Sequence, residues 1–292
     1  MTAIPFTKMV GTGNDFIIVD TRRRRLPSLR HRWPALSKTL CDRRRGVGAD
    51  GLLVLEPSKR AQVEMRVFNP DGSEAEMCGN GARCVALYIK DGIGDRRQET
   101  GGKPVTIETI AGVLSATVRG NRVAVRMTDP TELQVGLSLE IDGRRRPYGF
   151  VNTGVPHAVI PVTRLEEVEV NRLGRLVRTH RHFSPRGTNV NFIQPDALQR
   201  HHLHVRTYER GVEEETLACG TGVVASAIIH AFQNGSLPRP SVHVHTRSGD
   251  VLAVSLRIAR DERPPRVTDV VLEGPASHVF DGTVNWRSPH TR

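Results

Sequence analysis

The sequence predicts a mixed α/β (α+β) fold of two pseudo-symmetric domains, each a curled, mostly antiparallel sheet around a central helix. Three observations support this prediction: an internal repeat at an offset of about 141 residues, short segments in which apolar and polar residues alternate, and one apolar helical segment in each half. Motifs that recur in the same order at one offset indicate two copies of a single structural unit. We therefore expect two domains of the same fold.

The repeat is carried by four pairs of short motifs that follow one another in the same order. The pairs are Thr12–Val19 with Thr153–Ile160, Arg45–Gly48 with Arg186–Asn189, Arg66–Gly72 with Arg206–Gly211, and Cys78–Gly81 with Cys219–Gly222. Between the copies, Asp129-Pro130 interrupts the strand pattern. We expect the first domain over 1–128 and the second over 129–275, with the segment 276–292 returning to the first domain.

Periodicity predicts the elements within each copy. β-Branched residues alternate with polar ones, as in strands, over Val63–Phe68, Val105–Thr109, Val113–Val118 and Val123–Met127. After the first Cys-Gly-x-Gly motif, Ala82–Ile89 predicts a largely buried helix. After the second, Val223–Phe232 predicts another, which ends at Asn234-Gly235. One buried helix among many strands predicts a sheet that curls around it.

Composition excludes several classes of protein. The chain has 292 residues, of which 38% are hydrophobic and 25% charged, and it contains no apolar run long enough to span a membrane. It has four cysteines and begins without a signal-peptide pattern. We expect a reduced, cytoplasmic, globular protein with no membrane partner.

The net charge of +11 raises the question of a nucleic-acid partner. The basic runs Arg22–Arg25, Arg43–Arg45 and Arg144–Arg146 lie far apart, and aromatic residues make up only 4% of the chain. Single-strand binders need aromatic platforms within a basic groove. We therefore interpret these runs as solvated loops and expect no nucleic-acid partner.

The two Cys-Gly-x-Gly motifs carry the chemistry. Cys78 and Cys219 each immediately precede a predicted helix, where unpaired backbone N–H groups and the helix dipole favour an anion. Two such thiols around one ligand suit racemisation or epimerisation, in which one thiolate removes an α-proton and the other thiol supplies a proton to the opposite face. Such a reaction needs no metal or pyridoxal phosphate.

The other two cysteines, Cys41 and Cys84, lack this setting and are interpreted as packing residues. A zinc site is excluded because no pair of cysteines has the Cys-x2-4-Cys spacing.

These motifs resemble the diaminopimelate epimerase family along nearly the whole chain. The resemblance rests on Gly13–Phe16, Gly46–Gly51, Phe68–Arg83, Gly187–Phe192, and Tyr208–Gly211 with Ala218–Gly222. It implies a cofactor-independent two-base reaction that interconverts LL- and meso-2,6-diaminopimelate, in the biosynthesis of lysine and peptidoglycan precursors. It also suggests a homodimer.

The resemblance assigns roles to individual residues. Cys78 and Cys219 would be the two bases, and Gly79, Asn80, Gly220 and Thr221 would donate to the carboxylate at the reacting centre. Asn14, Asn69, Asn189, Glu209 and Arg210 would hold the substrate and its distal end. In the distal pocket, Arg210 would pair with the carboxylate, as a guanidinium fork does, and Glu209 with an ammonium.

Two departures from the family pattern concern the distal end. Val155 stands where many members have Asn, and Gly51 where some have Gln. Asn152 lies close enough in sequence to compensate. His157 is interpreted as a packing or site-shaping residue, because the two-thiol scheme leaves it no proton to carry.

Two alternatives remain open. One is a proline racemase-like enzyme with the same two thiols, in which His typically follows the first Cys-Gly, where this chain has Asn80. The other is a non-catalytic binding protein, against which the retention of both thiols argues.

Overall fold

The computed structural model describes residues 2–22, 29, 32–92, 103–233, 240–259, 262 and 265–286. The chain divides into two compact units. Unit 1 consists of Met1–Val125 with Pro275–Arg292, and unit 2 of Arg126–Gly274. The C-terminal strand thus belongs to the same unit as the N-terminal residues.

Unit 1 is a sheet of mixed direction that is mostly antiparallel. Its strands are β1 (Thr2–Gly11), β2 (Asn14–Asp20), β3 (Gly51–Glu56), β4 (Val63–Phe68), β5 (Glu74–Ala75), β6 (Val105–Thr109), β7 (Gly112–Arg119), β8 (Arg122–Arg126) and β18 (Ser277–Trp286). β18 pairs antiparallel with β1, and β1 pairs antiparallel with β2. β2 and β3 are parallel, β3 and β4 antiparallel, and β4 is parallel to β6.

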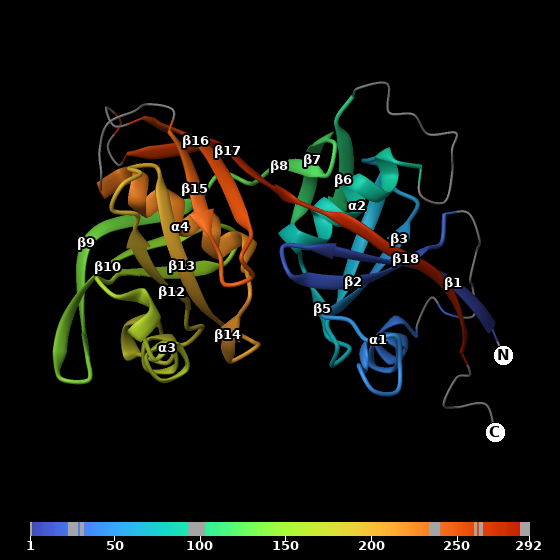
Figure 1. The fold of residues 1–292 in the computed structure, drawn as a ribbon, viewed down its shortest axis with the longest axis horizontal. Helices are drawn as coiled ribbons and strands as arrows, with labels where there is room; N and C mark the ends of the chain where they lie inside the picture. Colours follow the sequence, from blue (N-terminus) through green and yellow to red (C-terminus); the bar gives the residue numbers. More distant parts are fainter. Residues whose placement is uncertain are drawn as a thin grey trace. The chain divides into compact units, whose positions relative to one another are not determined.

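Two helices pack on this sheet. α2 (Gly79–Lys90) is buried along almost its whole length and contacts β1, β2, β4, β6, β7 and β18, so that the strands curl around it (Figure 1). α1 (Trp33–Cys41) contacts β3 and β4, and its apolar side chains join a core cluster with Ile17, Leu52 and Phe68. Burial of these apolar side chains holds the unit together.

Unit 2 is built in the same way. Its strands are β9 (Thr131–Ile141), β10 (Arg144–Asn152), β11 (Pro156–Pro161), β12 (Asn189–Pro195), β13 (His202–Glu209), β14 (Glu214–Thr216), β15 (Ser241–His245), β16 (Val251–Ala259) and β17 (Arg266–Pro275). α4 (Gly220–Gln233) contacts β10, β11, β12, β13, β15 and β16, while α3 (Val170–Arg178) packs on β12, β13 and β14. Two 3-10 turns, η2 (Leu165–Glu167) and η3 (Arg181–Phe183), flank α3.

The order of strand pairing repeats between the units. β10 and β11 are antiparallel, β11 and β12 parallel, β12 and β13 antiparallel, and β13 is parallel to β15, just as for β1, β2, β3, β4 and β6. In each unit, the central helix lies between a short strand and the next strand of the sheet: α2 between β5 and β6, and α4 between β14 and β15. β5 pairs antiparallel with β4, and β14 pairs antiparallel with β13. The predicted fold class of two similar sheet-and-helix halves is confirmed.

The local predictions agree closely with the structure. β4 and β6 have the predicted bounds, β7 is one residue longer at each end, and β8 ends at Arg126 instead of Met127. Both helices after the Cys-Gly-x-Gly motifs are confirmed, whereas the predicted helix end at Asn234-Gly235 and the residues Arg23–Arg25 lie outside the described part of the chain.

Helices α1 and α3 have no counterpart in the sequence-based prediction. Each is nine residues long, and neither Arg32 nor Glu169, the residue before each helix, makes a side-chain capping bond. Both helices therefore begin without a side-chain cap, although Pro34 in the first turn of α1 is typical of a helix start, and packing on a sheet stabilises them. Within the described ranges, no helix is long and apolar enough to cross a membrane.

Candidate active site

Cys78 lies at the start of the central helix of unit 1. It follows β5 in an extended conformation, with φ −140° and ψ 115°, and it is the N-cap residue of α2. The Gly81 N–H donates to Cys78 Sγ at 3.4 Å, and the Ala82 N–H donates to the Cys78 carbonyl at 2.8 Å. The half-buried sulfur thus receives a backbone donor at the positive end of a helix dipole, which favours the thiolate.

Cys219 occupies the matching position in unit 2. The Val223 N–H donates to its carbonyl at 2.8 Å, as Ala82 does to Cys78. Its Sγ lies 3.4 Å from Thr221 Oγ1, and Thr153 Oγ1 donates to the Thr221 carbonyl at 3.1 Å. The thiol is buried, with 7% of the residue exposed. Gly79 and Gly220 are the first residues of the two helices, where backbone N–H groups have no acceptor within the helix.

Glu209 lies against Cys219. It is the last residue of β13, and its side chain hydrogen-bonds to Cys219. Burial raises the pKa of the Glu209 carboxyl above its ordinary value, although its contacts with Thr216 and Cys219 lower it in part. Sequence reasoning placed Glu209 at a distal ammonium and did not anticipate this contact. A half-buried carboxyl that bonds a thiol can accept the proton of that thiol.

Asn189 and Arg210 form a second contact in unit 2. The Arg210 backbone N–H donates to Asn189 Oδ1 at 2.8 Å, and Asn189 Nδ2 donates to the Pro156 carbonyl at 3.2 Å. Arg210 Nη1 donates to the Arg186 carbonyl at 3.2 Å. Pro156 and Arg186 also line a cavity of about 270 Å³. Asn189 and Arg210 therefore hydrogen-bond to residues that line this cavity but do not line it themselves.

Asn152 lines the same cavity. Its Nδ2 donates to Glu132 Oε1 at 3.1 Å, and its Oδ1 accepts from the Gly154 N–H at 3.1 Å. Its side-chain amide thus shapes the turn that carries Val155.

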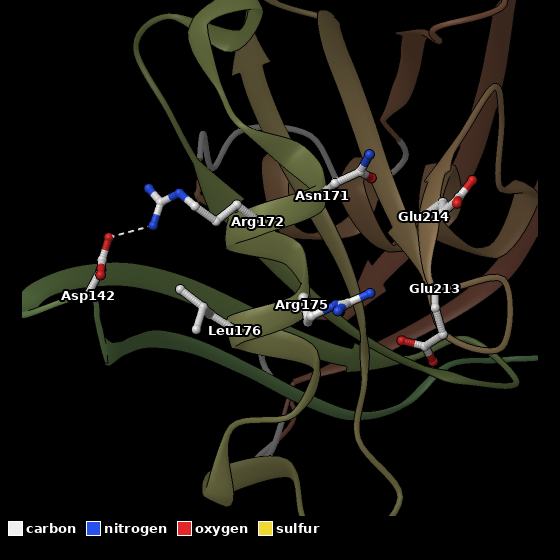
Figure 2. Close-up of a pocket in the computed structure, with 7 residues that line it drawn as sticks. All are labelled: Asp142, Asn171, Arg172, Arg175, Leu176, Glu213 and Glu214. Atoms are coloured by element: carbon white, nitrogen blue, oxygen red, sulfur yellow. Dashed lines mark hydrogen bonds and ion pairs between the residues drawn. The ribbon is translucent and has the colours of Figure 1, made fainter.

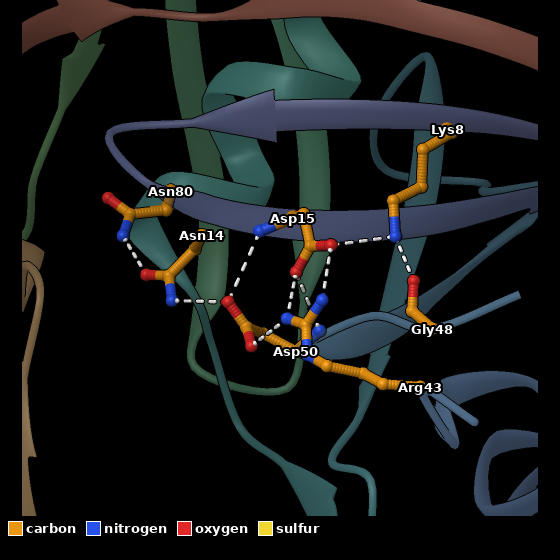
Figure 3. Close-up of polar contacts among 7 residues, drawn as sticks. All are labelled: Lys8, Asn14, Asp15, Arg43, Gly48, Asp50 and Asn80. Carbon is orange, nitrogen blue, oxygen red and sulfur yellow. Dashed lines mark hydrogen bonds and ion pairs between the residues drawn. The ribbon is translucent and has the colours of Figure 1, made fainter. Parts of the chain in front are cut away.

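In unit 1, Asn14 and Asn80 are joined directly. Asn80 Nδ2 donates to Asn14 Oδ1 at 2.5 Å, and Asn14 Nδ2 donates to Asp50 Oδ2 at 3.1 Å (Figure 3). Asn69 lies elsewhere, in the exposed turn between β4 and β5, where its Nδ2 donates to Ser73 Oγ at 2.9 Å. The structure therefore brings two of the three predicted asparagines of unit 1 together.

Charged groups surround this asparagine pair. Lys8 Nζ and Arg43 Nη2 each lie 2.7 Å from a carboxylate oxygen of Asp15, and Arg43 Nη2 also lies 2.7 Å from Asp50 Oδ1 (Figure 3). Burial alone would raise the pKa of Asp15, but hydrogen bonds from Arg43 and Lys8 outweigh it and lower the pKa to about 2. Lys8 also donates to the Gly48 carbonyl. The loop that contains Asp50 is thereby tied to the start of β2.

His157 is completely buried in unit 2. Its Nδ1 lies 3.1 Å from Asn191 Nδ2, and burial, with a smaller effect from the charge of Arg210, lowers its pKa to about 3. Its Nε2 has no hydrogen-bond partner in the part of the chain that the structure describes. His157 is thus a neutral, buried residue, as the packing interpretation expects.

The remaining cysteines lie in the core. Cys41 and Cys84 are buried, and desolvation raises the pKa of both thiols, that of Cys84 to about 12. All four cysteines are free thiols. The packing interpretation of Cys41 and Cys84 is confirmed.

A separate groove of about 590 Å³ runs along α3 in unit 2 (Figure 2). It is lined by Asp142, Asn171, Arg172, Arg175, Leu176, Glu213 and Glu214. Arg172 pairs with Asp142 at 2.7 Å across it. The groove contains none of the predicted site residues. Within the described ranges, no group of three or more His, Cys, Asp or Glu side chains is arranged to hold a metal ion.

The fold and the paired thiols define the class of protein. Two matching units, each with a cysteine at the start of its buried central helix, are the arrangement expected of an isomerase that moves an α-proton. The family model for diaminopimelate epimerase matches residues 6–133 and 149–279. The diaminopimelate epimerase of Aquifex aeolicus is 41% identical over 288 residues, which cover 96% of this chain and 97% of that protein. The chain belongs to the diaminopimelate epimerase family, and the resemblance found in the sequence is confirmed.

Solved structures of lower identity share the fold. A PhzF-family phenazine biosynthesis protein of Bacillus anthracis superposes with a TM-score of 0.71 at 17% identity, covering 98% of this chain and all of that chain. A protein described as a probable proline racemase of Agrobacterium radiobacter gives a TM-score of 0.70 at 17% identity, with coverages of 97% and 93%. At this identity, the likeness concerns the fold alone.

Proposed function

We propose that this protein interconverts LL- and meso-2,6-diaminopimelate, with Cys78 and Cys219 as the two acid–base groups. Membership of the diaminopimelate epimerase family supports the substrate. The observation that carries the mechanism is the matched pair of helix starts, each with a cysteine that the fold repeat places at the same point of its unit. Cys41 and Cys84, buried in the core, offer no comparable pair.

Each step moves one proton. One thiolate removes the proton from the α-carbon, and the electron pair left behind is delocalised into the adjacent carboxylate as the α-carbon becomes planar. The other thiol then donates its proton to the opposite face, which inverts the centre. The first cysteine ends protonated and the second ends as the thiolate, so the enzyme is ready for the reverse direction.

The helix starts supply the electrostatic stabilisation. Gly79 and Asn80 at α2, and Gly220 and Thr221 at α4, offer backbone N–H groups to a carboxylate that gains negative charge during proton removal. Glu209, bonded to Cys219, is placed to accept the proton that converts this thiol into the thiolate. Recognition of the distal end falls to Asn189 and Arg210, which hydrogen-bond to Pro156 and Arg186 at the wall of the cavity of unit 2.

The proposal includes a cellular setting. The reaction serves lysine and peptidoglycan precursor synthesis, and it needs both thiols reduced, which suits the cytoplasm. The four free cysteines agree with this location. We further propose that the protein acts as a homodimer, as the family resemblance suggests.

The test is solvent-deuterium exchange at the α-position of LL- and meso-diaminopimelate by the reduced enzyme, with proline as the comparison substrate. We expect exchange and inversion of diaminopimelate only. Cys78→Ala and Cys219→Ala should each abolish net epimerisation, whereas Cys41→Ala, which removes a buried core thiol, should retain it. Turnover of proline in place of diaminopimelate would favour the racemase alternative, and net epimerisation by either active-site variant would refute the two-base assignment.

A further inference from the structure

We propose that Asp50 and Arg83 are positioning residues that fix the orientation of the side-chain amides of Asn14 and Asn80 for binding of a substrate carboxylate. The inference deepens the proposed function and rests on it for the identity of the ligand. The hydrogen bonds that carry it lie entirely within unit 1.

The four side chains form one continuous chain of hydrogen bonds. Arg83 Nη2 donates to Asn80 Oδ1 at 2.6 Å, Asn80 Nδ2 donates to Asn14 Oδ1 at 2.5 Å, and Asn14 Nδ2 donates to Asp50 Oδ2 at 3.1 Å. Figure 3 shows the two amides facing one another, with Asp50 at the far end. Every bond runs in the same direction, from the guanidinium to the carboxylate.

The two ends of this series of hydrogen bonds, Arg83 and Asp50, determine the direction of every bond. A guanidinium can only donate and an ionised carboxylate can only accept, whereas an amide can turn either its oxygen or its nitrogen toward a neighbour. If Asn14 alone turned over, two of the three contacts would oppose like groups, namely nitrogen with nitrogen at Asn80 and oxygen with oxygen at Asp50. If both amides turned over, both end contacts would be mismatched. Only the observed orientation satisfies all three bonds.

Both ends are themselves held firmly. Arg83 is completely buried on α2, where its Nη2 also donates to Thr12 Oγ1 at 2.5 Å and its Nε to the Pro275 carbonyl at 3.4 Å. At the other end, Asp50 Oδ2 also accepts from the Asp15 backbone N–H at 3.3 Å, and Asp50 Oδ1 accepts from Arg43 at 2.7 Å. The amides between them are therefore pre-organised before a ligand arrives.

The fixed orientation decides what Asn14 offers to a ligand. Its oxygen accepts from Asn80 and one amide hydrogen is donated to Asp50, so its second amide hydrogen is the donor that remains. A carboxylate needs donors, and an Asn14 amide turned the other way would present an oxygen that repels it. Asp50 thus acts through Asn14 and need not touch the substrate.

The experiment compares two replacements of Asp50 that differ in one property. Asp50→Asn and Asp50→Leu both remove the negative charge and the ion pair with Arg43, but only Asn keeps an oxygen to accept from Asn14. We expect Asp50→Leu to raise the KM for diaminopimelate by about tenfold or more, as for a lost hydrogen bond to a charged group, with kcat changed much less. Asp50→Asn should raise the KM less than about threefold, the tolerance we allow for a retained oxygen acceptor. Arg43→Gln is the matched control for the ion pair, and we expect it to behave like Asp50→Asn.

A second readout does not depend on catalysis. The side-chain amide protons of Asn14, followed by nitrogen-15 NMR, should give one slowly exchanging pair in the wild type and in Asp50→Asn, and a faster-exchanging pair in Asp50→Leu. Equal KM and equal exchange in the two Asp50 variants would overturn the inference. If the wild type fails to turn over diaminopimelate, the proposed function fails, and the NMR comparison alone then decides whether Asp50 positions Asn14.

Discussion

The glycine that ends each Cys-Gly-x-Gly motif provides a sharp test of how the helix starts hold the thiols. Gly222 and Gly81 occupy the same position in the two units, three residues after Cys219 and Cys78. A Cβ at Gly222 would lie 2.4 Å from Asn191 Oδ1, whereas a Cβ at Gly81 would lie 3.1 and 3.3 Å from the two methyl carbons of Leu53. The same substitution, Gly to Ala, therefore meets very different surroundings.

The cost at Gly222 follows from what Asn191 is bound to. Asn191 is completely buried; its Nδ2 lies 3.1 Å from His157 and donates to the Ala158 carbonyl, while its Oδ1 accepts from Thr207 at 3.0 Å. Ordinary contact begins near 3.4 Å, so the start of α4 or the amide must move by about 1 Å. Overpacking of this kind costs about 1–3 kcal/mol.

Both substitutions also share a favourable contribution. Replacing a helical glycine by alanine stabilises a helix by about 0.5–1 kcal/mol. Because this gain is common to both variants, the difference between them isolates the clash. At Gly81, the ends of the Leu53 side chain need to move by only a few tenths of an ångström. We expect Gly222→Ala to be about 1–3 kcal/mol less stable than Gly81→Ala.

Activity should respond more strongly than stability. A displacement of about 1 Å in a catalytic group can lower the rate by about 10²-fold. We therefore expect kcat for diaminopimelate epimerisation to fall by about two orders of magnitude in Gly222→Ala and by less than about fivefold in Gly81→Ala. The assays are urea unfolding followed by circular dichroism and initial rates of epimerisation. Equal losses in the two variants would refute the argument that Asn191 sets the position of the Cys219 helix start.

Three further predictions concern titration. Removing the Asp15 carboxylate by Asp15→Asn should lower the free energy of unfolding by about 1–2 kcal/mol near neutral pH, after allowance for solvent screening. Because the pKa of Asp15 is lowered from 3.8 to about 2, this contribution is present above pH 4 and is lost as the pH falls from 3.8 toward 2. A difference in the free energy of unfolding between wild type and Asp15→Asn that stays constant over this range would contradict the prediction. Because burial raises the pKa of Glu209, the acid limb of the pH profile of kcat/KM should lie above the ordinary glutamate pKa of 4.5. Glu209→Gln should abolish that limb. An unchanged pH profile in this variant would count against Glu209 as the proton acceptor. The pKa of His157 is lowered from 6.5 to about 3, so its ring should remain neutral at pH 5 in proton NMR. Because the unfolded chain takes up a proton that the folded protein does not, the free energy of unfolding should fall by about 1.4 kcal/mol per pH unit as the pH drops below 6.5. An imidazole that titrates near 6.5 would show that the ring is not buried as described.

Much of this protein was determined by its sequence alone. The matched motifs around Cys78 and Cys219 revealed two copies of one unit, because local signals such as glycine turns, alternating strands and an apolar helix after each cysteine are written in short stretches of chain. The two helices α2 and α4 and the strands β4 and β6 follow from those signals. The core roles of Cys41 and Cys84 were also accessible, since they stand outside the motifs.

Other features were decided only by the tertiary structure. Helices α1 and α3 lack capping bonds and exist because sheets bury their apolar faces. The contact of Glu209 with Cys219 joins residues on a strand and at a helix start, and the hydrogen bonds from Arg83 through Asn80 and Asn14 to Asp50 join residues up to 66 positions apart. Hydrogen bonds between such distant residues depend on how strands and helices pack, and no local pattern encodes them. The sequence therefore pointed to the two cysteines that we propose do the chemistry, and packing set which neighbours surround them.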